Sequence, residues 1–328
     1  MLSIVSNAMC LVLAAIITIA IAKYTNKYCS LCQPGSSSGD RANHTMCLYR
    51  GVGPACTDAL DGGVKVEERH LILQEHNRLR SWVASGNEAR GLGEGAPQPP
   101  AANMMALNWD EELARVAQLW ADQCAFQHDC RHVEDFKVGQ NIAQFWNSVA
   151  PVIQWQQVIR SWYDEVGSWS SADTPKFRFT GTQKMTAHYT QVVWAQTRFV
   201  GCGRRSFRKG QFYVEHYVCN YGPTGNYRGE PLYLTGAPCS RCPEDSECTG
   251  GVLCVAGAGR RPDIYAYRYQ HEPSAVIATA HDVGVVDLNV TSAPEDNKLY
   301  ASSTGREEAG QALQDKWLRY VIVRYSKS

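Results

Sequence analysis

Apolar residues recur every three to four positions in three stretches of the chain, a pattern that predicts three amphipathic helices. The first helix begins at Val66 and ends at Gly86. The second follows a Pro/Gly-rich loop at 91–100, and Asn108 with Glu111 predicts a capping box at its start. The third covers about 152–166. Their predicted inward faces are, in order, Ile72, His76, Leu79 and Val83; Leu113, Val116, Ala117, Trp120, Ala121 and Cys124; and Val158, Ile159, Trp162 and Val166.

Later in the chain the hydrophobic period changes to two. Residues 212–219 alternate between two faces and follow a β-rich run at 198–207, which predicts a hairpin with its turn at Lys209-Gly210. The hairpin would set Cys202 and Cys219 on neighbouring strands, where a disulfide needs Cα atoms about 4.4–6.8 Å apart. Helices first and strands last, without βαβ alternation, predict an α+β sandwich.

The first 22 residues form an uncharged apolar run that ends in Ala20-Ile21-Ala22. Small residues at Ala20 and Ala22 are those that signal peptidase accepts, so we predict a signal peptide at 1–22 that is cleaved after Ala22. The alternative is a membrane anchor, because no Lys or Arg precedes the run. We prefer the signal peptide, since spanning takes about 20 apolar residues.

Removing Cys10 with the signal peptide takes the 13 cysteines to 12. An even set in an exported chain predicts disulfides. For Cys29-x-x-Cys32 and Cys239-x-x-Cys242 the alternative to disulfides is a zinc site, because that spacing lets two thiolates reach one ion. Segments 23–65 and 234–255 hold too few apolar residues for a core of their own, so their cysteines must staple them.

Charge and short motifs narrow the function classes further. Lys+Arg 32 balance Asp+Glu 32, which gives no global electrostatic reason to expect nucleic acid or an anionic membrane as a partner. Sequons at Asn43 and Asn289 predict glycosylation, and they have meaning only in the secretory route. We therefore expect a secreted, extracellular glycoprotein without integral membrane association after signal cleavage.

Four motifs carry a family resemblance. They are residues 188–194 (HYTQVVW), 217–227 (YVCNYGPTGNY), 76–80 (HNRLR) and 139–143 (GQNIA). Together they resemble the cysteine-rich secretory, antigen 5 and pathogenesis-related 1 (CAP) family, and the cysteine pattern before Val66 is similar to that of arthropod antigen 5 proteins, known as venom allergen 5. The resemblance implies a three-layer α-β-α sandwich (CAP or SCP domain) at 66–233, after an N-terminal arm at 23–65.

The same resemblance implies the disulfide pairs. In the arm and the domain they are Cys29–Cys47, Cys32–Cys130, Cys56–Cys124 and Cys202–Cys219. Segment 234–255 resembles the small hinge that follows this domain in cysteine-rich secretory proteins, which implies Cys239–Cys248 and Cys242–Cys254. The extension 256–328 has no cysteine, so a channel-blocking function like that of the six-cysteine module in reptile-venom relatives loses its main support.

Matching by motif implies a cleft lined by His128, Gln140, Glu165 and His188, with Gln140 where many members have Glu. Two imidazoles can hold Zn²⁺ or Cu²⁺, with Glu165 as a ligand or as the group that orients one ring. Stable zinc sites use three or four protein ligands, so we expect weak binding and no required cofactor. An amide at Gln140 cannot take a proton, which argues against hydrolysis. The alternative is that both histidines are buried scaffold residues.

Aromatic residues crowd one region of the sequence and offer flat apolar surface for a sterol, fatty acid or eicosanoid. The alternative is that they form core, as aromatics at helical spacing usually do. The candidates are Phe145, Trp146, Trp155, Trp162 and Trp169.

We therefore expect a secreted, non-enzymatic protein that binds a small hydrophobic ligand or an extracellular protein target, with an optional metal. Two alternatives stay open: a metal-dependent secreted hydrolase, and a venom or salivary protein-interaction effector without lipid.

Overall fold

The computed structural model describes residues 26–32, 43–93, 97–150, 153–178 and 186–257. The predicted signal peptide at 1–22, the Asn289 sequon and residues 258–328 of the predicted extension lie outside these ranges. Among the described residues, no helix has the length and apolar character needed to cross a membrane.

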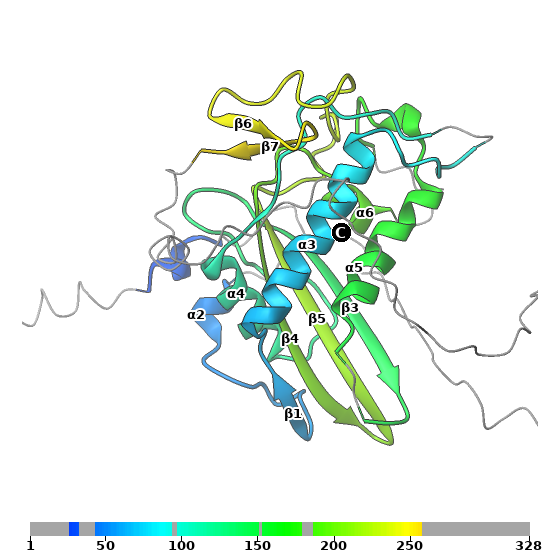
Figure 1. The fold of residues 1–328 in the computed structure, drawn as a ribbon. Coiled ribbons are helices and arrows are strands. Elements are labelled where there is room, and N and C mark those ends of the chain that lie inside the picture. The colour runs from blue at the N-terminus through cyan, green and yellow to red at the C-terminus, as the bar shows by residue number, and fades with distance from the viewer. Residues whose placement is uncertain (1–25, 33–42, 94–96, 151–152, 179–185, 258–328) are drawn as a thin grey trace, which may run out of the picture.

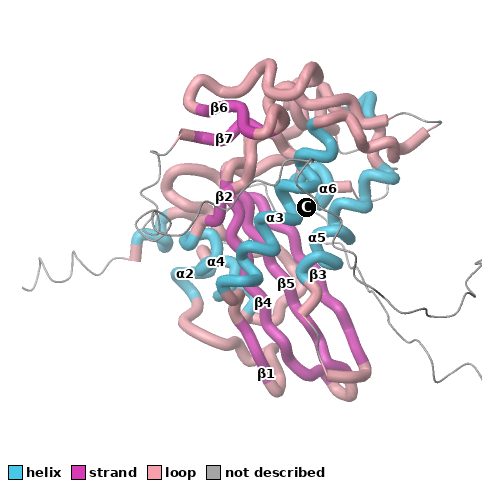
Figure 2. Tube along the Cα trace, in the orientation of Figure 1, coloured by secondary structure: helices cyan, strands magenta, loops and turns pink. Residues whose placement is uncertain are grey.

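A mixed sheet forms the middle layer of the body (Figures 1 and 2). Its strand order is β1-β4-β5-β3, the three neighbouring pairs are antiparallel, and the short β2 pairs with β4 in parallel. The strands are β1 (Ala59–Gly62), β2 (Asn108–Trp109), β3 (Gly139–Asn147), β4 (Phe199–Lys209) and β5 (Phe212–Gly222).

Helices cover both faces of the sheet, so the α+β sandwich is confirmed. The helix α4 packs against β4 and β5 on one face, and α3, α5 and α6 lie over the other (Figure 1). The helices are α2 (Thr45–Leu48), α3 (Val66–Ala84), α4 (Glu111–Ala121), α5 (Trp155–Tyr163) and α6 (Ala187–Val192). Short 3-10 turns lie at η1 (Lys27–Ser30), η2 (Asp164–Ser168) and η3 (Ser171–Asp173).

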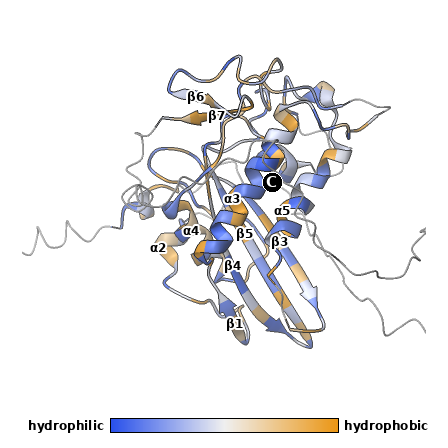
Figure 3. Cartoon of the chain, viewed as in Figure 1, coloured by the Kyte–Doolittle hydropathy of each residue, from blue (hydrophilic) through white to orange (hydrophobic). Residues whose placement is uncertain are grey.

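Alternate residues of β5 pack into the apolar clusters on the two faces of the sheet, because successive strand side chains point to opposite faces. Tyr217 and Tyr221 join the main core with residues of α3 and α5, whereas Val218 packs with Trp120 of α4. In α3, the buried residues recur every three to four positions, with polar residues between them. Figure 3 shows hydrophobic and hydrophilic residues along this helix.

Two glycines of β4 let α4 lie directly on the sheet. A Cβ at Gly201 would meet the backbone nitrogen of Ala114 at 2.2 Å, and one at Gly203 would meet the Cα of Gln118 at 2.3 Å. Real Cβ atoms do not approach backbone so closely, so a larger residue at either position would push α4 away.

Several sequence-based expectations about elements need correction. The α4 helix is capped by Asp110, whose side chain accepts from the Leu113 N–H, and Asn108 instead lies in β2. Three strands, β1, β2 and β3, precede β4, so the helices do not all come before the strands. The hairpin turn falls at Gly210 and Gln211, one residue later than predicted.

The hinge forms its own two-stranded sheet, β6 (Ser246–Thr249) with β7 (Leu253–Ala256). It lies at one end of the body (Figure 1) and contributes Leu253 to the main core. The hinge is therefore docked on the domain.

Candidate functional site

His128 is held by Gln140, which lies near the start of β3. The ring Nδ1 and the Gln140 Oε1 are 2.8 Å apart. The Gln140 Nε2 donates to Asp129 Oδ1 and to Asn220 Oδ1, each at 2.9 Å. Two acceptors on the amide nitrogen leave Oε1 as the atom that faces His128, so His128 Nδ1 carries the proton and donates.

The second histidine is held by a carboxylate. His188 Nδ1 lies 2.7 Å from Glu165 Oε1, which sets the proton on Nδ1 in this ring too. The Glu165 Oε2 accepts from the backbone N–H groups of His188 at 3.0 Å and Tyr189 at 3.1 Å. Trp162 of α5 stacks on the imidazole with ring centroids 6.3 Å apart. Glu165 thus fixes both the ring and the first turn of α6.

The strand β3 ties the two histidines together. Gln140 bonds the ring of His128, and the next residue, Asn141, donates its amide to the His188 carbonyl at 3.2 Å. Neighbouring residues of one strand thus hold the ring of His128 and the backbone of His188. The order of the sheet makes β3 an edge strand, and two separate hydrogen-bonded pairs meet at its start.

The four sequence-predicted residues fit a weak metal site only in part. The ring nitrogen that Gln140 and Glu165 do not contact is Nε2 in both residues, and this is the atom through which each ring would bind a metal. Both oxygens of Glu165 accept hydrogen bonds from N–H groups, and these bonds fit the predicted role of orienting the His188 ring. The set His128, His188 and Glu165 does not bring three ligand atoms within 4.8 Å of one another.

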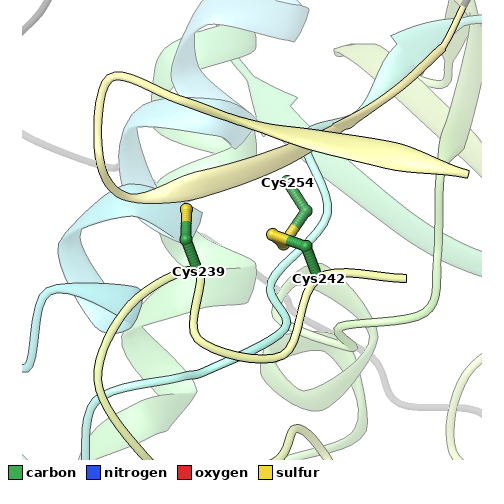
Figure 4. A group of neighbouring side chains, drawn as sticks. All are labelled: Cys239, Cys242 and Cys254. Carbon is green, nitrogen blue, oxygen red and sulfur yellow. A yellow bond between two sulfur atoms is a disulfide. The ribbon is translucent and has the colours of Figure 1, made fainter. Parts of the chain in front are cut away.

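One group among the described residues does meet that distance, namely Cys239, Cys242 and Cys254 (Figure 4). Cys242 is bonded to Cys254, and Cys239 is bonded to Cys248. A sulfur in a disulfide is not a thiolate, and zinc binds the thiolate. The disulfides therefore take these sulfurs out of use as zinc ligands.

The structure has the six disulfides that the resemblance implies. They are Cys29–Cys47, Cys32–Cys130, Cys56–Cys124, Cys202–Cys219, Cys239–Cys248 and Cys242–Cys254. Every cysteine among the described residues is thus paired. Asn43, the sequon in these ranges, is exposed beside the arm disulfide of Cys47.

The aromatic cluster proposed for a lipid is mostly core. Phe145, Trp155, Trp162 and Trp169 are buried in the main apolar cluster, three of them with 1% exposure or less. Trp146 is half-buried and packs against the Cys56–Cys124 cluster. A lipid that used the four buried rings would have to displace core side chains, so the geometry favours the structural role.

Sequence reasoning missed Asp129, the group that anchors Gln140. Asp129 is 1% exposed, and Thr45 of the arm donates its hydroxyl to the carboxylate. Burial raises the pKa of the Asp129 carboxyl, against the opposing charge of Arg131. Asp129 directly follows His128 in the sequence, which was the one sign that it belongs to the site. Its contact with Thr45, 84 residues away, cannot be predicted from the sequence.

Arg80 has a positioning role that the motif at 76–80 did not reveal. It is fully buried on α3, and burial lowers its pKa to about 9. Its guanidinium donates to carbonyls at distances of 2.8 to 3.2 Å, and so fixes the chain that leaves α6. The acceptors belong to Met105, Val192, Trp194, Ala195 and Thr197.

His76 and His216 are scaffold residues. His76 bonds the Ile72 carbonyl at 2.8 Å and the Tyr221 hydroxyl at 2.9 Å, and burial lowers its pKa to about 4. His216 is fully buried, packs edge-on against Phe126, and has a pKa lowered by burial to about 3. Both rings are therefore neutral in the folded protein near pH 7.

Comparison with known proteins agrees with this fold and these motifs. Residues 73–221 match the Cysteine-rich secretory protein family. Over 211 residues the chain is 44% identical to venom allergen 3 of Solenopsis invicta, covering 63% of this chain and 88% of that protein. Over 215 residues it is 40% identical to venom allergen 5 of Vespula flavopilosa, covering 64% of this chain and 100% of that one.

A solved structure supports the fold. The structure of BmVAL-1 matches with a TM-score of 0.54 and 26% identity, covering 61% of this chain and 99% of that one. The chain therefore belongs to the CAP, or cysteine-rich secretory protein, family. Within the family it is similar to the insect venom allergens.

Proposed function

We propose that this protein is secreted and acts outside the cell as a non-catalytic binding protein of the venom-allergen type. Six disulfides among the described residues support export, because disulfides persist in oxidising compartments. The apolar run at 1–22 and the exposed sequon at Asn43 support the same route.

The observation that carries the non-catalytic part is the state of the two histidine pairs. His128 is paired with a neutral amide, and a hydrolase would need a base there. The one carboxylate in the set, Glu165, is engaged by three N–H donors on the protein itself. Such an arrangement orients the two rings and lacks the pair of carboxylates that could divide the roles of acid and base.

An extracellular protein target is the ligand class that the geometry favours over a lipid. Four of the five rings that were predicted to bind a sterol or fatty acid are packed in the main core. In contrast, Trp82 on α3 is 46% exposed, and exposed Trp is typical of protein-binding surfaces. A small hydrophobic ligand is the second candidate, and it would require a pocket that opens by moving core side chains.

Weak binding of Zn²⁺ or Cu²⁺ at His128 and His188 is an optional property of the same protein. The proposal is supported by the contacts of the two Nδ1 atoms with Gln140 and Glu165, which orient the rings and leave Nε2 as the atom that would bind the ion. The ion would supply a Lewis acid, whereas the protein residues hold the rings in orientation.

Native mass spectrometry of the chain secreted from insect cells tests the proposal. We expect the protein in the medium, at the mass of the oxidised polypeptide plus glycan, and unchanged by organic extraction. Asn43→Gln should remove one glycan. Mass lost to organic solvent would instead support a lipid carrier, and near-stoichiometric mass lost to a chelator would contradict the weak metal site. Retention of the chain inside the cell would contradict secretion.

A further inference from the structure

The far end of the β4–β5 hairpin extends beyond the helices on both faces of the sheet (Figure 1). Gly210 adopts a φ of +61°, which lets the two-residue turn Gly210–Gln211 reverse the chain tightly. The end of β3 lies beside it, because Asn147 pairs with Tyr213. We call residues 208–213, with Trp146 and Val149, the hairpin tip.

One face of the hairpin tip combines a cation with two aromatic rings. The Lys209 Nζ lies 5.6 Å from the centre of the Trp146 ring. Trp146 meets Phe212 edge to face, with centroids 6.0 Å apart. Lys209 is exposed, and both rings are half-buried. The cation and the rings therefore present one continuous amphipathic surface.

The opposite face repeats this combination. The Arg208 guanidinium carbon lies 5.0 Å from the centre of the Tyr213 ring, and Arg208 is exposed. Arg208 and Lys209 point to opposite faces because they are neighbours in a strand. Val149, in the segment after β3, is 69% exposed and adds an apolar side chain.

The cations of the tip differ from the other arginines of the same strand. Arg204 is paired with Asp61 and Glu215, and Arg205 with Asp122. Within the described ranges Arg208 and Lys209 have no ion pair, and their side chains lie against rings instead. Two cations thus keep their charge uncompensated at the most protruding part of the hairpin.

We propose that the hairpin tip docks on the surface of an anionic lipid bilayer. Trp, Tyr and Phe favour the bilayer interface, where an apolar ring meets a wet boundary, and Lys and Arg there reach the headgroup phosphates. The charge complementarity is local, since the whole chain has no net charge. A polyanionic chain would need a longer row of cations, whereas aromatic residues on both faces of a narrow tip suit shallow insertion.

Sedimentation with lipid vesicles tests the charge contribution. The secreted, oxidised protein should partition onto phosphatidylcholine vesicles that contain 30% phosphatidylserine, and weakly onto pure phosphatidylcholine. Each cation near an anionic surface strengthens binding about fivefold. Arg208→Gln with Lys209→Gln should therefore lower the partition coefficient about 25-fold. Raising the salt concentration from 0.1 to 0.5 M should weaken the wild-type binding.

Arg228→Gln with Arg241→Gln is the matched control, because it removes two exposed positive charges outside the tip. It should leave partitioning within about twofold of the wild type, and both double variants should melt like the wild type. Equal losses in the two double variants would overturn the assignment of the tip. So would equal binding to neutral and anionic vesicles.

Fluorescence tests the insertion of the rings. Lipids brominated near the headgroup should quench part of the tryptophan emission, and Trp146→Phe should remove most of that quenching while it keeps an aromatic ring. Val149→Asp should lower vesicle partitioning without a change in melting temperature. Quenching that is unchanged in Trp146→Phe would overturn the proposed orientation. Retention on immobilised heparin that depends on Arg208 and Lys209, without vesicle binding, would assign the surface to a polysaccharide instead.

Discussion

The N-terminal arm and the C-terminal hinge are both cysteine-rich segments without a core of their own, yet they are attached to the body differently. Two of the three arm disulfides cross to the segment that follows α4, at Cys32–Cys130 and Cys56–Cys124. Both hinge disulfides stay within the hinge and close short loops. The arm is therefore covalently fixed to the domain, whereas the hinge is held to the domain by noncovalent contacts.

The contacts of the hinge explain why it needs no disulfide to the body. The Cys254 N–H donates to the Met104 carbonyl, and the Ala106 N–H donates to the Cys254 carbonyl, each at 2.8 Å. Leu253 is 1% exposed in the main core. The arm, in contrast, buries little apolar surface, and its contacts with the body are mainly polar, such as Thr45 with Asp129. Disulfides to the domain thus replace apolar burial in the arm, whereas the hinge is attached by apolar burial and backbone hydrogen bonds.

Removal of Cys32–Cys130 should give the largest loss of stability. The bond closes a sequence separation of 98 residues, and a loop of that length without other cross-links corresponds to about 4.7 kcal/mol in the loop-entropy account. This value is an upper limit for Cys32→Ser with Cys130→Ser, because the intact Cys56–Cys124 bond lies inside the loop and shortens it. Urea unfolding measures the change. The control is Cys29→Ser with Cys47→Ser, which opens a separation of 18 residues in the same arm and should cost about 3.2 kcal/mol. A larger loss in the control would contradict the predicted ranking of the two bonds.

Truncation of Leu253 should detach the hinge. Leu253→Ala leaves a cavity in the main core, and such substitutions cost about 2–5 kcal/mol. Hydrogen exchange should then become faster in β6 and β7 before the domain unfolds, because the hinge has lost its apolar anchor. Val255→Ala is the control, since Val255 is half-buried and should cost about 1 kcal/mol. Unchanged exchange in the hinge of Leu253→Ala would show that backbone hydrogen bonds alone hold it.

Removal of Cys239–Cys248 should have a smaller effect than removal of the long-range arm bond. Its sequence separation is nine residues, which corresponds to about 2.6 kcal/mol. Cys239→Ser with Cys248→Ser should lower the protection of β6 against hydrogen exchange and leave the arm unchanged. Faster exchange in the arm of this variant would contradict the independence of the two segments.

The same comparison shows which features the sequence could predict. Helical periodicity located α3, α4 and α5, because each has one apolar face. β3 was missed since its first seven residues are buried, so it shows no alternation of polar and apolar residues. The wrong cap at Asn108 arose because its pairing with Phe199 in β4 is long-range and leaves no local pattern.

At the candidate site, the motifs located His128, Gln140, Glu165 and His188 but not the bonds between them. That Glu165 is engaged on both oxygens follows from the backbone N–H groups at the start of α6, which no sequence pattern reveals. Burial of the aromatic rings depends on how α5 packs on α3 and α6, so periodicity alone left the lipid and core alternatives open.

Acidification should loosen the arm more than the hinge. His44 is fully buried, its Nδ1 accepts from the Met46 N–H at 3.0 Å, and its Nε2 donates to the His132 carbonyl at 2.8 Å. Burial lowers the pKa of His44 below 6.5, although the bond to the His132 carbonyl opposes this. The unfolded arm therefore binds a proton that the folded arm does not, and its stability falls as the pH drops below about 6.5.

Hydrogen-exchange protection factors at pH 7.5 and 5.5, corrected for intrinsic exchange, measure this difference. We expect the protection of α2 to fall more than that of β6 and β7, because residues 234–255 contain no histidine. The matched variant is His44→Asn, whose amide oxygen can still cap α2 but whose side chain does not titrate. It should remove the extra loss in α2 and leave the loss shared by the whole domain, to which the buried His76 and His216 contribute. A loss in α2 that persists in His44→Asn would assign the acid response to another group near the arm. The buried Asp129 carboxyl would not explain such a loss, because a pKa raised in the folded state adds stability as the pH falls.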